Sequence, residues 1–247
     1  MSSPLPRPGA SALAPDDRQA LAMLTADLRR IFGVGLHALV VYGFARNAAD
    51  EPLHTLALVE RVTFEHLAAC APVTDAWRRA GLAVPLLLGR DEFARTLDIF
   101  PLEYHAIISD HVVVEGADPF EGLRVAESDR RRACEQLARS HLIHLREGFL
   151  EVSREPRDVG RLIASSAPGF RGLLVNIAQL DGGGTSTSDE GIAADAERTI
   201  GVPARIVLDV LTYERHATAA ADPTALIALY LAAIEQIWTY VDAWRRG

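Results

Sequence analysis

The chain has 247 residues, of which 49% are hydrophobic, which is enough apolar material for one large domain or two ordinary ones. Its 25 basic and 33 acidic side chains give a net charge of −8, and this balance opposes the phosphate contacts that drive nucleic-acid binding. We therefore expect no nucleic-acid partner. The chain contains no lysine, which excludes a Walker A site and a Schiff-base mechanism.

The N-terminal residues 1–14 are rich in Pro, Ser and Ala without periodicity, so we predict a flexible tail. The tail holds no continuous apolar segment of the kind found in signal peptides, and no later stretch offers 18 uncharged apolar residues. These features predict a cytoplasmic protein with no membrane span. Cys70 and Cys134 lie in no metal-ligand spacing, so we expect both to be buried thiols.

Residues 15–122 alternate between helical and strand patterns. An amphipathic helix is predicted from Pro15 to about Gly33, with acidic residues early and Arg late. Apolar runs predict strands at 36–43, 54–60, 82–89 and 111–116, with helical segments at 63–81, 90–98 and 100–108 between them. We expect the segment 63–81 to break before Pro72. The pattern predicts a small domain built on a mixed α/β sheet.

Residues 123–247 carry only helical patterns, with expected helices at 128–153, 156–182, 190–201, 203–217 and 222–244. The second of these is expected to bend at Pro168. The last carries a broad apolar face that includes Tyr230 and Trp238, which is typical of a bundle core, and a homodimer interface through the C-terminal helices is the alternative. We interpret the Gly-rich residues 181–191 as a solvated connector. The predicted fold class is thus α+β: a mixed-sheet α/β domain followed by an all-helical bundle domain.

A short motif joins the first two predicted strands. Tyr42 and Gly43 end the first strand, and in the second strand alternation sends Thr55 and Ala57 to the same face. Phosphate chemistry at this place would need carboxylates on that face to hold Mg²⁺. Neither side chain is a carboxylate.

This motif resembles the nucleotidyltransferase superfamily, in which a Gly-Ser turn is followed by an Asp-x-Asp pair on the next strand. The downstream segments "DIFPLEYHAII", "HVVVEG" and "DPF" look like a branch of that superfamily with a C-terminal helical domain. By position, Phe44 replaces the serine, and Thr55 and Ala57 replace the two aspartates. The resemblance therefore implies a nucleotidyltransferase-like domain with a degenerate site, a vestigial pocket formed by Gly43, Phe44, Arg46, Thr55 and Ala57.

In the family, the paired aspartates chelate the metal ions that neutralise the triphosphate. A third carboxylate usually comes from the following strand, and the segment "VPLLLG" at 84–89 offers none. We therefore expect no catalytic residue, no metal and no cofactor, and a binding or regulatory role toward an unknown protein partner or small ligand. The alternative is an active nucleotidyltransferase that uses relocated carboxylates, with Asp50, Glu51 and Glu60 as candidates.

The helical half contains two further candidate groups. Arg139 and His144 have the Arg-x4-His spacing of a ribonuclease motif found in some helical domains, but residues five apart on a helix diverge by about 140°. The spacing of His141, His144 and Glu147 likewise fans around a helix, unlike the paired histidines of a zinc helix. We interpret both groups as surface or bundle residues.

Overall fold

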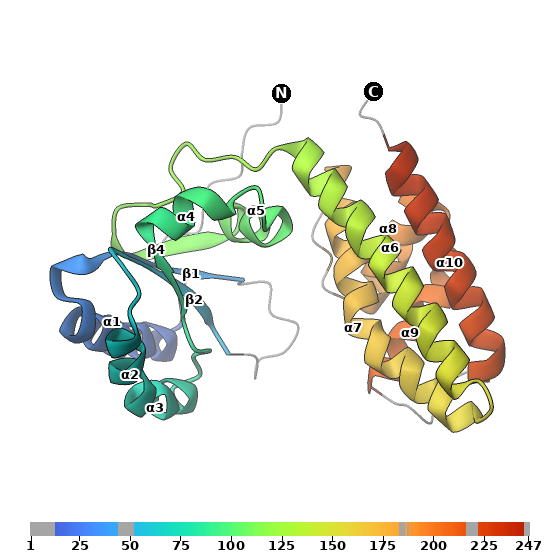
Figure 1. The fold of residues 1–247 in the computed structure, drawn as a ribbon, viewed down its shortest axis with the longest axis horizontal. Coiled ribbons are helices and arrows are strands. Elements are labelled where there is room, and N and C mark those ends of the chain that lie inside the picture. Colours follow the sequence, from blue (N-terminus) through green and yellow to red (C-terminus); the bar gives the residue numbers. More distant parts are fainter. Residues whose placement is uncertain (1–12, 44–51, 183–185, 187, 216–221, 245–247) are drawn as a thin grey trace. The chain divides into compact units, whose positions relative to one another are not determined.

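The computed structural model describes residues 13–43, 52–182, 186, 188–215 and 222–244 (Figure 1). The chain divides into two compact units, with the boundary between Ala126 and Glu127. The first unit contains a sheet and the second is helical, in the order that the sequence patterns predict. The boundary lies a few residues beyond the expected one at 122/123 because the first helix of the second unit begins at Glu127.

The first unit alternates helices and strands. In chain order its elements are α1 (Pro15–Phe32), η2 (Gly33–Gly35), β1 (Leu36–Tyr42), β2 (His54–Val59), α2 (Phe64–Cys70), η3 (Ala71–Val73), α3 (Thr74–Arg79), β3 (Leu86–Gly89), α4 (Arg90–Thr96), α5 (Pro101–Ser109) and β4 (His111–Gly116). The predicted interruption before Pro72 is present, since α2 ends at Cys70 and a 3-10 turn leads into α3.

The four strands form one mixed sheet with the order β3-β2-β1-β4. β1 is antiparallel to both β2 and β4, whereas β2 and β3 run parallel. The parallel pair needs a crossover, and α2 and α3 provide it. The β1–β2 register places Tyr42 opposite His54 and Leu36 opposite Val59, so the chain after β1 and the chain after β2 lie at opposite ends of the sheet.

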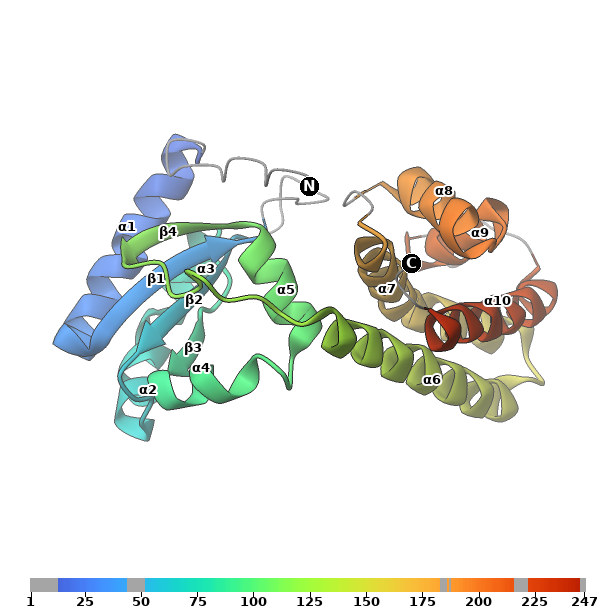
Figure 2. The ribbon, with the colours of Figure 1, turned by 90° about the horizontal axis from the view of Figure 1, so that it is seen from above.

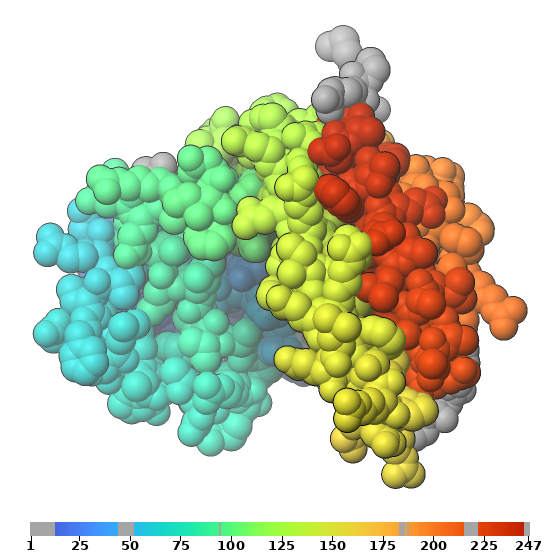
Figure 3. Space-filling model, turned by 45° about the vertical axis from the view of Figure 1, so that its right-hand side comes forward, coloured from blue at the N-terminus to red at the C-terminus, as the bar shows by residue number. Residues whose placement is uncertain are grey.

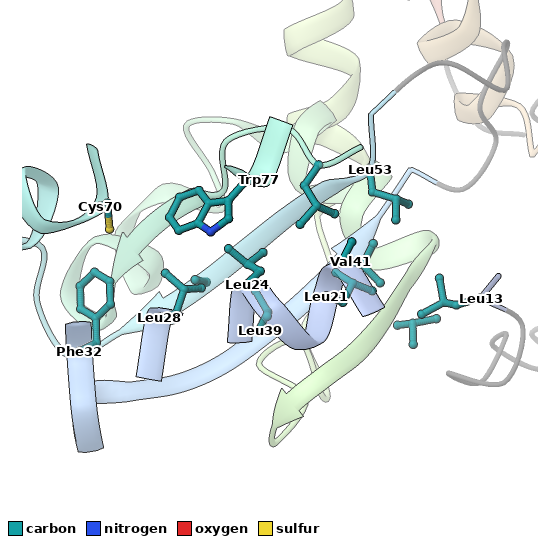
Figure 4. Packing of buried hydrophobic residues seen from close by; sticks show 14 of the residues in the cluster. Leu13, Leu21, Leu24, Leu28, Phe32, Leu39, Val41, Leu53, Cys70 and Trp77 are labelled. Carbon is teal, nitrogen blue, oxygen red and sulfur yellow. The ribbon is translucent and has the colours of Figure 1, made fainter. Parts of the chain in front are cut away.

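Helices cover both faces of this sheet, as Figure 2 shows with α1 on one side and α4 and α5 on the other. On the first face, α1 packs Leu24 and Leu28 into a core with Leu39, Val41 and Trp77, most of which is visible in Figure 4. On the second face, a smaller core contains Val40, Leu56, Phe93, Tyr104, Ile107 and Phe120. The alternation along β1 and β2 is what separates these two cores.

The second unit is a bundle of α6 (Glu127–Val152), α7 (Pro156–Leu180), α8 (Asp189–Ile200), α9 (Ala204–Arg215) and α10 (Pro223–Ala243). Pro168 lies inside α7, which remains one helix from Pro156 to Leu180. Arg171 on α7 bonds Asp189 on α8 at 2.6 Å and Glu214 on α9 at 2.8 Å. The Arg171 side chain is only 15% exposed, so this network of three charged residues links α7, α8 and α9 where few water molecules can reach it.

Helix α10 contributes much of the bundle core, and Figure 3 shows it running beside α6. Its buried residues are Leu226, Ile227, Tyr230, Ala233, Ile234, Ile237 and Val241. Leu229 on the same helix is 50% exposed. Among the described residues, α10 is also the one helix long and apolar enough to cross a membrane, with a mean hydropathy of 1.4 in an 18-residue window of which 39% is buried. Core helices pass the same test.

Candidate functional site

The turn after β1 is built on Gly43. Its φ of +73° lies in the left-handed region that favours glycine, and its N–H donates to the Asp110 carbonyl at 3.4 Å. A Cβ added at this position would meet no atom within 4 Å, so backbone conformation rather than lack of space selects glycine here. The following residues Phe44, Arg46, Asp50 and Glu51 lie outside the described part of the chain.

Thr55 and Ala57 point toward the face of the sheet that α1 covers. Their exposed fractions are 1% and 0%, and in the β1–β2 ladder they lie opposite Val41 and Leu39, two members of the α1 core. The Thr55 hydroxyl is buried and has no hydrogen-bond partner among the described residues. The two positions that the family resemblance assigns to metal-chelating aspartates are therefore occupied by uncharged side chains inside a packed core.

Gly43 and Thr55 lie at the same end of the sheet, because Tyr42 pairs with His54. Ala57 lies two residues further along β2. The described members of the expected vestigial pocket thus cluster in space, but the side chains of Thr55 and Ala57 face the core. Whether a pocket forms at the turn stays a prediction, since Phe44 and Arg46 are outside the described residues.

Glu60, one of the candidate relocated carboxylates, lies at the other end of β2. Its N–H donates to the Gly35 carbonyl at 2.7 Å, and a strand rise of about 3.3 Å per residue places it about 16 Å from Thr55. Its carboxylate contacts His37 Nε2 at 2.7 Å and Arg90 at 3.7 Å, and the hydrogen bond from His37 is the largest cause that lowers the pKa of Glu60. Metal ligands must lie within about 2 to 2.6 Å of a shared ion, so Glu60 is too far away to act at the Gly43 turn.

Sequence reasoning missed a group of polar side chains at the Gly43 end of the sheet. The rings of Tyr42 and His54 lie 5.8 Å apart, and burial raises the pKa of Tyr42. His111 pairs with Tyr42 across β1 and β4. These residues were not singled out because each looks like an ordinary strand residue, and only the strand register brings them together.

His111 is held from both sides of its ring. Its Nδ1 lies 3.1 Å from the Ile107 carbonyl, and its Nε2 lies 3.1 Å from Asp118 Oδ1, which also accepts the Phe120 N–H at 2.8 Å. The Phe120 ring packs edge-on against the imidazole at 4.9 Å. Because the His111 side chain is only 1% exposed, this His-Asp pair fixes the loop after β4 and is not open to a substrate. In the sequence, the "DPF" segment at residues 118–120 is the feature that indicates this loop.

Arg139 and His144 both line a hollow of about 470 Å³ on α6, but their side chains contact different partners. The Arg139 guanidinium lies over the Trp238 ring at 4.9 Å, while His144 is exposed and contacts Glu147 at 3.2 Å. His141 turns instead toward Tyr230 on α10, at 2.6 Å. Within the described ranges, no three His, Cys, Asp or Glu side chains gather as a metal-binding group.

The chain has a nucleotidyltransferase-like fold, an N-terminal α/β sheet followed by a C-terminal helical domain, as the sequence resemblance predicts. No family model matches the chain, and no curated protein matches it. Five chains of solved structures do match.

One of these solved structures is the spectinomycin adenyltransferase AAD(9) from Enterococcus faecialis, crystallised with ATP and spectinomycin. The match has a TM-score of 0.51 and 12% sequence identity, and it covers 88% of this chain and 98% of that one. At this identity the likeness shows the shared fold alone. The sheet unit and the helical unit are both included in it, because almost all of both chains is covered.

Proposed function

We propose that this protein uses a nucleotidyltransferase-like fold for binding and does not transfer nucleotides. One observation carries the proposal: the two positions that the sequence resemblance assigns to metal-chelating aspartates, Thr55 and Ala57, hold uncharged and buried side chains. In phosphoryl transfer the metal ions supply most of the charge stabilisation, so a site without their ligands lacks the main source of catalysis. The location of Glu60 at the far end of β2 adds support, because it removes one of three replacement carboxylates.

An adenylyl-transfer assay tests the proposal. The full-length protein is incubated with labelled ATP, with Mg²⁺ or Mn²⁺, and with a set of hydroxyl and amine acceptors that includes spectinomycin and the protein itself. We expect no label transfer above the level of a boiled control. Transfer that depends on metal and is lost in Asp50→Ala or Glu51→Ala would overturn the proposal and establish the relocated-carboxylate enzyme, and Glu60→Ala serves as the matched control that leaves it intact.

Binding is measured separately from transfer. A ligand that prefers the folded state must raise the melting temperature, so ATP, Mg²⁺ and spectinomycin are tested singly and together. A shift with ATP in the absence of transfer would support retained nucleotide binding. The proposal also includes a homodimer through the C-terminal helices, an unknown protein partner and a cytoplasmic location. Size-exclusion chromatography with light scattering tests the homodimer.

A further inference from the structure

A hollow of about 380 Å³ lies between α6 and α7 in the helical unit. Leu137 and Leu145 on α6 and Leu162 on α7 supply apolar walls. The polar lining consists of His141, His144, Ser140, Ser165 and Ser166. The described residues that line the hollow include no Asp, Glu or Arg. A space of this size with apolar walls and a few polar groups has the character of a small-molecule site.

Two glycines explain why the space exists. At Gly148 the helices touch, because an added Cβ would lie 2.6 Å from Leu162 Cδ1. At Gly169, in contrast, an added Cβ would lie 3.4 Å from His141 Nδ1, so the missing side chain keeps the space beside this nitrogen open. The hollow therefore lies beside the point of close helix contact, with His141 Nδ1 at its wall.

The other nitrogen of His141 is already used. Nε2 lies 2.6 Å from the Tyr230 hydroxyl, which in turn lies 3.3 Å from Ser166 Oγ. Ser166 has an acceptor for its own proton in the Ile163 carbonyl at 2.9 Å. The Tyr230 hydroxyl has one proton to donate, and the shorter contact gives it to His141 Nε2.

This arrangement decides the tautomer of His141. Burial, with a smaller contribution from His144, lowers the pKa of His141 to about 4, so its ring is neutral near pH 7. A neutral imidazole that accepts at Nε2 carries its proton at Nδ1. In the opposite tautomer, Nε2–H would donate to the Tyr230 hydroxyl, which already accepts from Ser166 Oγ at 3.3 Å, and the Tyr230 proton would have no acceptor among the described residues. These contacts favour a proton on Nδ1, which lies beside Gly169 in the lining of the hollow.

We propose that this hollow, here called the α6–α7 pocket, binds an uncharged small molecule, with a carbonyl oxygen that accepts the His141 Nδ1 proton and an apolar body against Leu137, Leu145 and Leu162. A charged ligand is disfavoured because the lining offers it no permanent counter-charge to offset its desolvation. Such a ligand would be one instance of the binding role proposed above. Its binding to the α6–α7 pocket does not depend on whether the Gly43 turn is catalytic.

Three probes with one ring and different head groups test the ligand class: cyclohexanone, cyclohexanecarboxylate and cyclohexylamine. Each is titrated into full-length protein labelled with ¹⁵N-histidine near pH 7, and the ring nitrogens of His141 are followed by NMR. We expect cyclohexanone to shift the Nδ1 resonance and to bind about tenfold more tightly than the charged probes. Failure of all three to perturb His141, or a preference for the carboxylate or the amine, would overturn the proposal while leaving the adenylyl-transfer result untouched.

Gly169→Ala blocks the pocket without harming the helix. The new methyl group would stand 3.4 Å from His141 Nδ1 and 3.6 Å from Cε1, so it narrows the space beside the ring, and alanine is a better helix former than glycine. Gly172→Ala in the same helix is the matched control, because a Cβ there would meet nothing within 4 Å. We expect both variants to keep or raise the melting temperature and only Gly169→Ala to weaken cyclohexanone binding, by about tenfold. Equal affinity in the two variants would contradict the proposed site.

Tyr230→Phe tests the positioning role of the Tyr230 hydroxyl. Without this hydroxyl, His141 Nε2 loses its proton donor, so we expect the ¹⁵N shifts of His141 to move toward the Nε2–H tautomer and cyclohexanone binding to weaken. A purely structural role for Tyr230 would change stability and leave the tautomer unchanged. Retention of the Nδ1–H tautomer in Tyr230→Phe would refute the hydrogen-bond chain on which the pocket depends.

Discussion

Trp77 Nε1 donates a hydrogen bond to Asp27 Oδ2 at 3.0 Å and thereby joins α3 to α1 beside the core of the sheet unit. The Trp77 side chain is fully buried, and α1 packs Leu24 and Leu28 into the same core (Figure 4). A buried indole N–H without an acceptor is costly, so Asp27 has a role that its place near the surface of an amphipathic helix does not suggest.

Loss of the Asp27 carboxylate should therefore destabilise the sheet unit. We expect Asp27→Ala to lower the free energy of unfolding by about 1 to 3 kcal/mol, because it leaves Trp77 Nε1 without its acceptor. Asp27→Asn keeps an acceptor oxygen and should cost less. Urea denaturation followed by tryptophan fluorescence measures both. Asp75→Ala, which removes an exposed ion pair with Arg78, is the control, and an equal loss in Asp27→Ala and Asp75→Ala would show that the Trp77 bond contributes nothing.

Removal of the Thr55 hydroxyl, in contrast to removal of the Asp27 carboxylate, should not destabilise the sheet unit. The hydroxyl is buried without a described partner, so it carries a desolvation cost that no hydrogen bond offsets. Thr55→Val keeps the shape of the side chain and removes the hydroxyl. We expect it to leave stability unchanged or to raise the unfolding free energy by up to about 1 kcal/mol, as measured by urea denaturation. A loss of more than about 1 kcal/mol would show that the hydroxyl has a partner in the folded protein.

An aspartate at position 57 should harm the fold rather than restore a metal site. Ala57 is fully buried in the α1 core, so Ala57→Asp places a carboxyl group among Leu39, Val41 and their neighbours. We expect a loss on the order of 3 to 5 kcal/mol, or no folded protein, and no gain in Mg²⁺ binding by calorimetry. His54→Asp on the exposed end of β2 is the control and should cost much less. A stable Ala57→Asp variant that binds Mg²⁺ would contradict the buried placement of this position.

The sequence predicts the elements of this fold well because each one carries its own local pattern. The period-two alternation along β2 separates Thr55 and Ala57 from His54 and Leu56, and the structure confirms that separation. The helix break before Pro72 follows from proline chemistry alone. The position of Glu60 could not be predicted in the same way. Glu60 is close to the Gly43 turn in sequence, but the six-residue antiparallel strand β2 places it at the other end of the sheet.

Contacts between distant segments were beyond sequence reasoning. His141 and Tyr230 are 89 residues apart, and their meeting depends on how α6 and α10 pack, which no local pattern specifies. The space beside His141 Nδ1 depends in turn on a glycine of α7. In the sequence His141 stands out only as one of three spaced residues with His144 and Glu147, and that spacing does not predict its contact with Tyr230.

The two cysteines should be unreactive in the folded protein. Cys134 is fully buried, and burial raises the pKa of its thiol to about 12, while burial also raises the pKa of Cys70. Thiolate is the reactive form, so we expect an aromatic disulfide reagent at pH 8 to label neither cysteine in native protein and both after denaturation in urea. Fast labelling of native Cys134→Ala would identify Cys70 as exposed, and fast labelling of native Cys70→Ala would do the same for Cys134.

The low pKa of His141 makes the stability of the helical unit depend on pH. His141 is neutral when folded down to about pH 4, whereas its unfolded pKa is 6.5, so between these values the unfolded chain binds the extra proton. Stability therefore falls as pH drops below 6.5 and stops falling from this cause near pH 4. The groups that face the ring are His144 on its own helix, itself paired with Glu147, and Tyr230 from α10, and none of them is an acid that would hold an imidazolium in place.

We expect the protonation of His141 in the unfolded chain to lower the free energy of unfolding by roughly 2 kcal/mol between pH 7 and pH 5. Carboxylates also begin to titrate in this range, so the measurement is a difference between variants: urea denaturation of the wild type, His141→Gln and His144→Gln at both pH values. The wild type and His144→Gln should lose stability in parallel, and His141→Gln should lose distinctly less, because glutamine does not titrate. If His141→Gln shows the same loss as the wild type, His141 is protonated in the folded protein near pH 5, and its Nε2 does not accept the Tyr230 proton there.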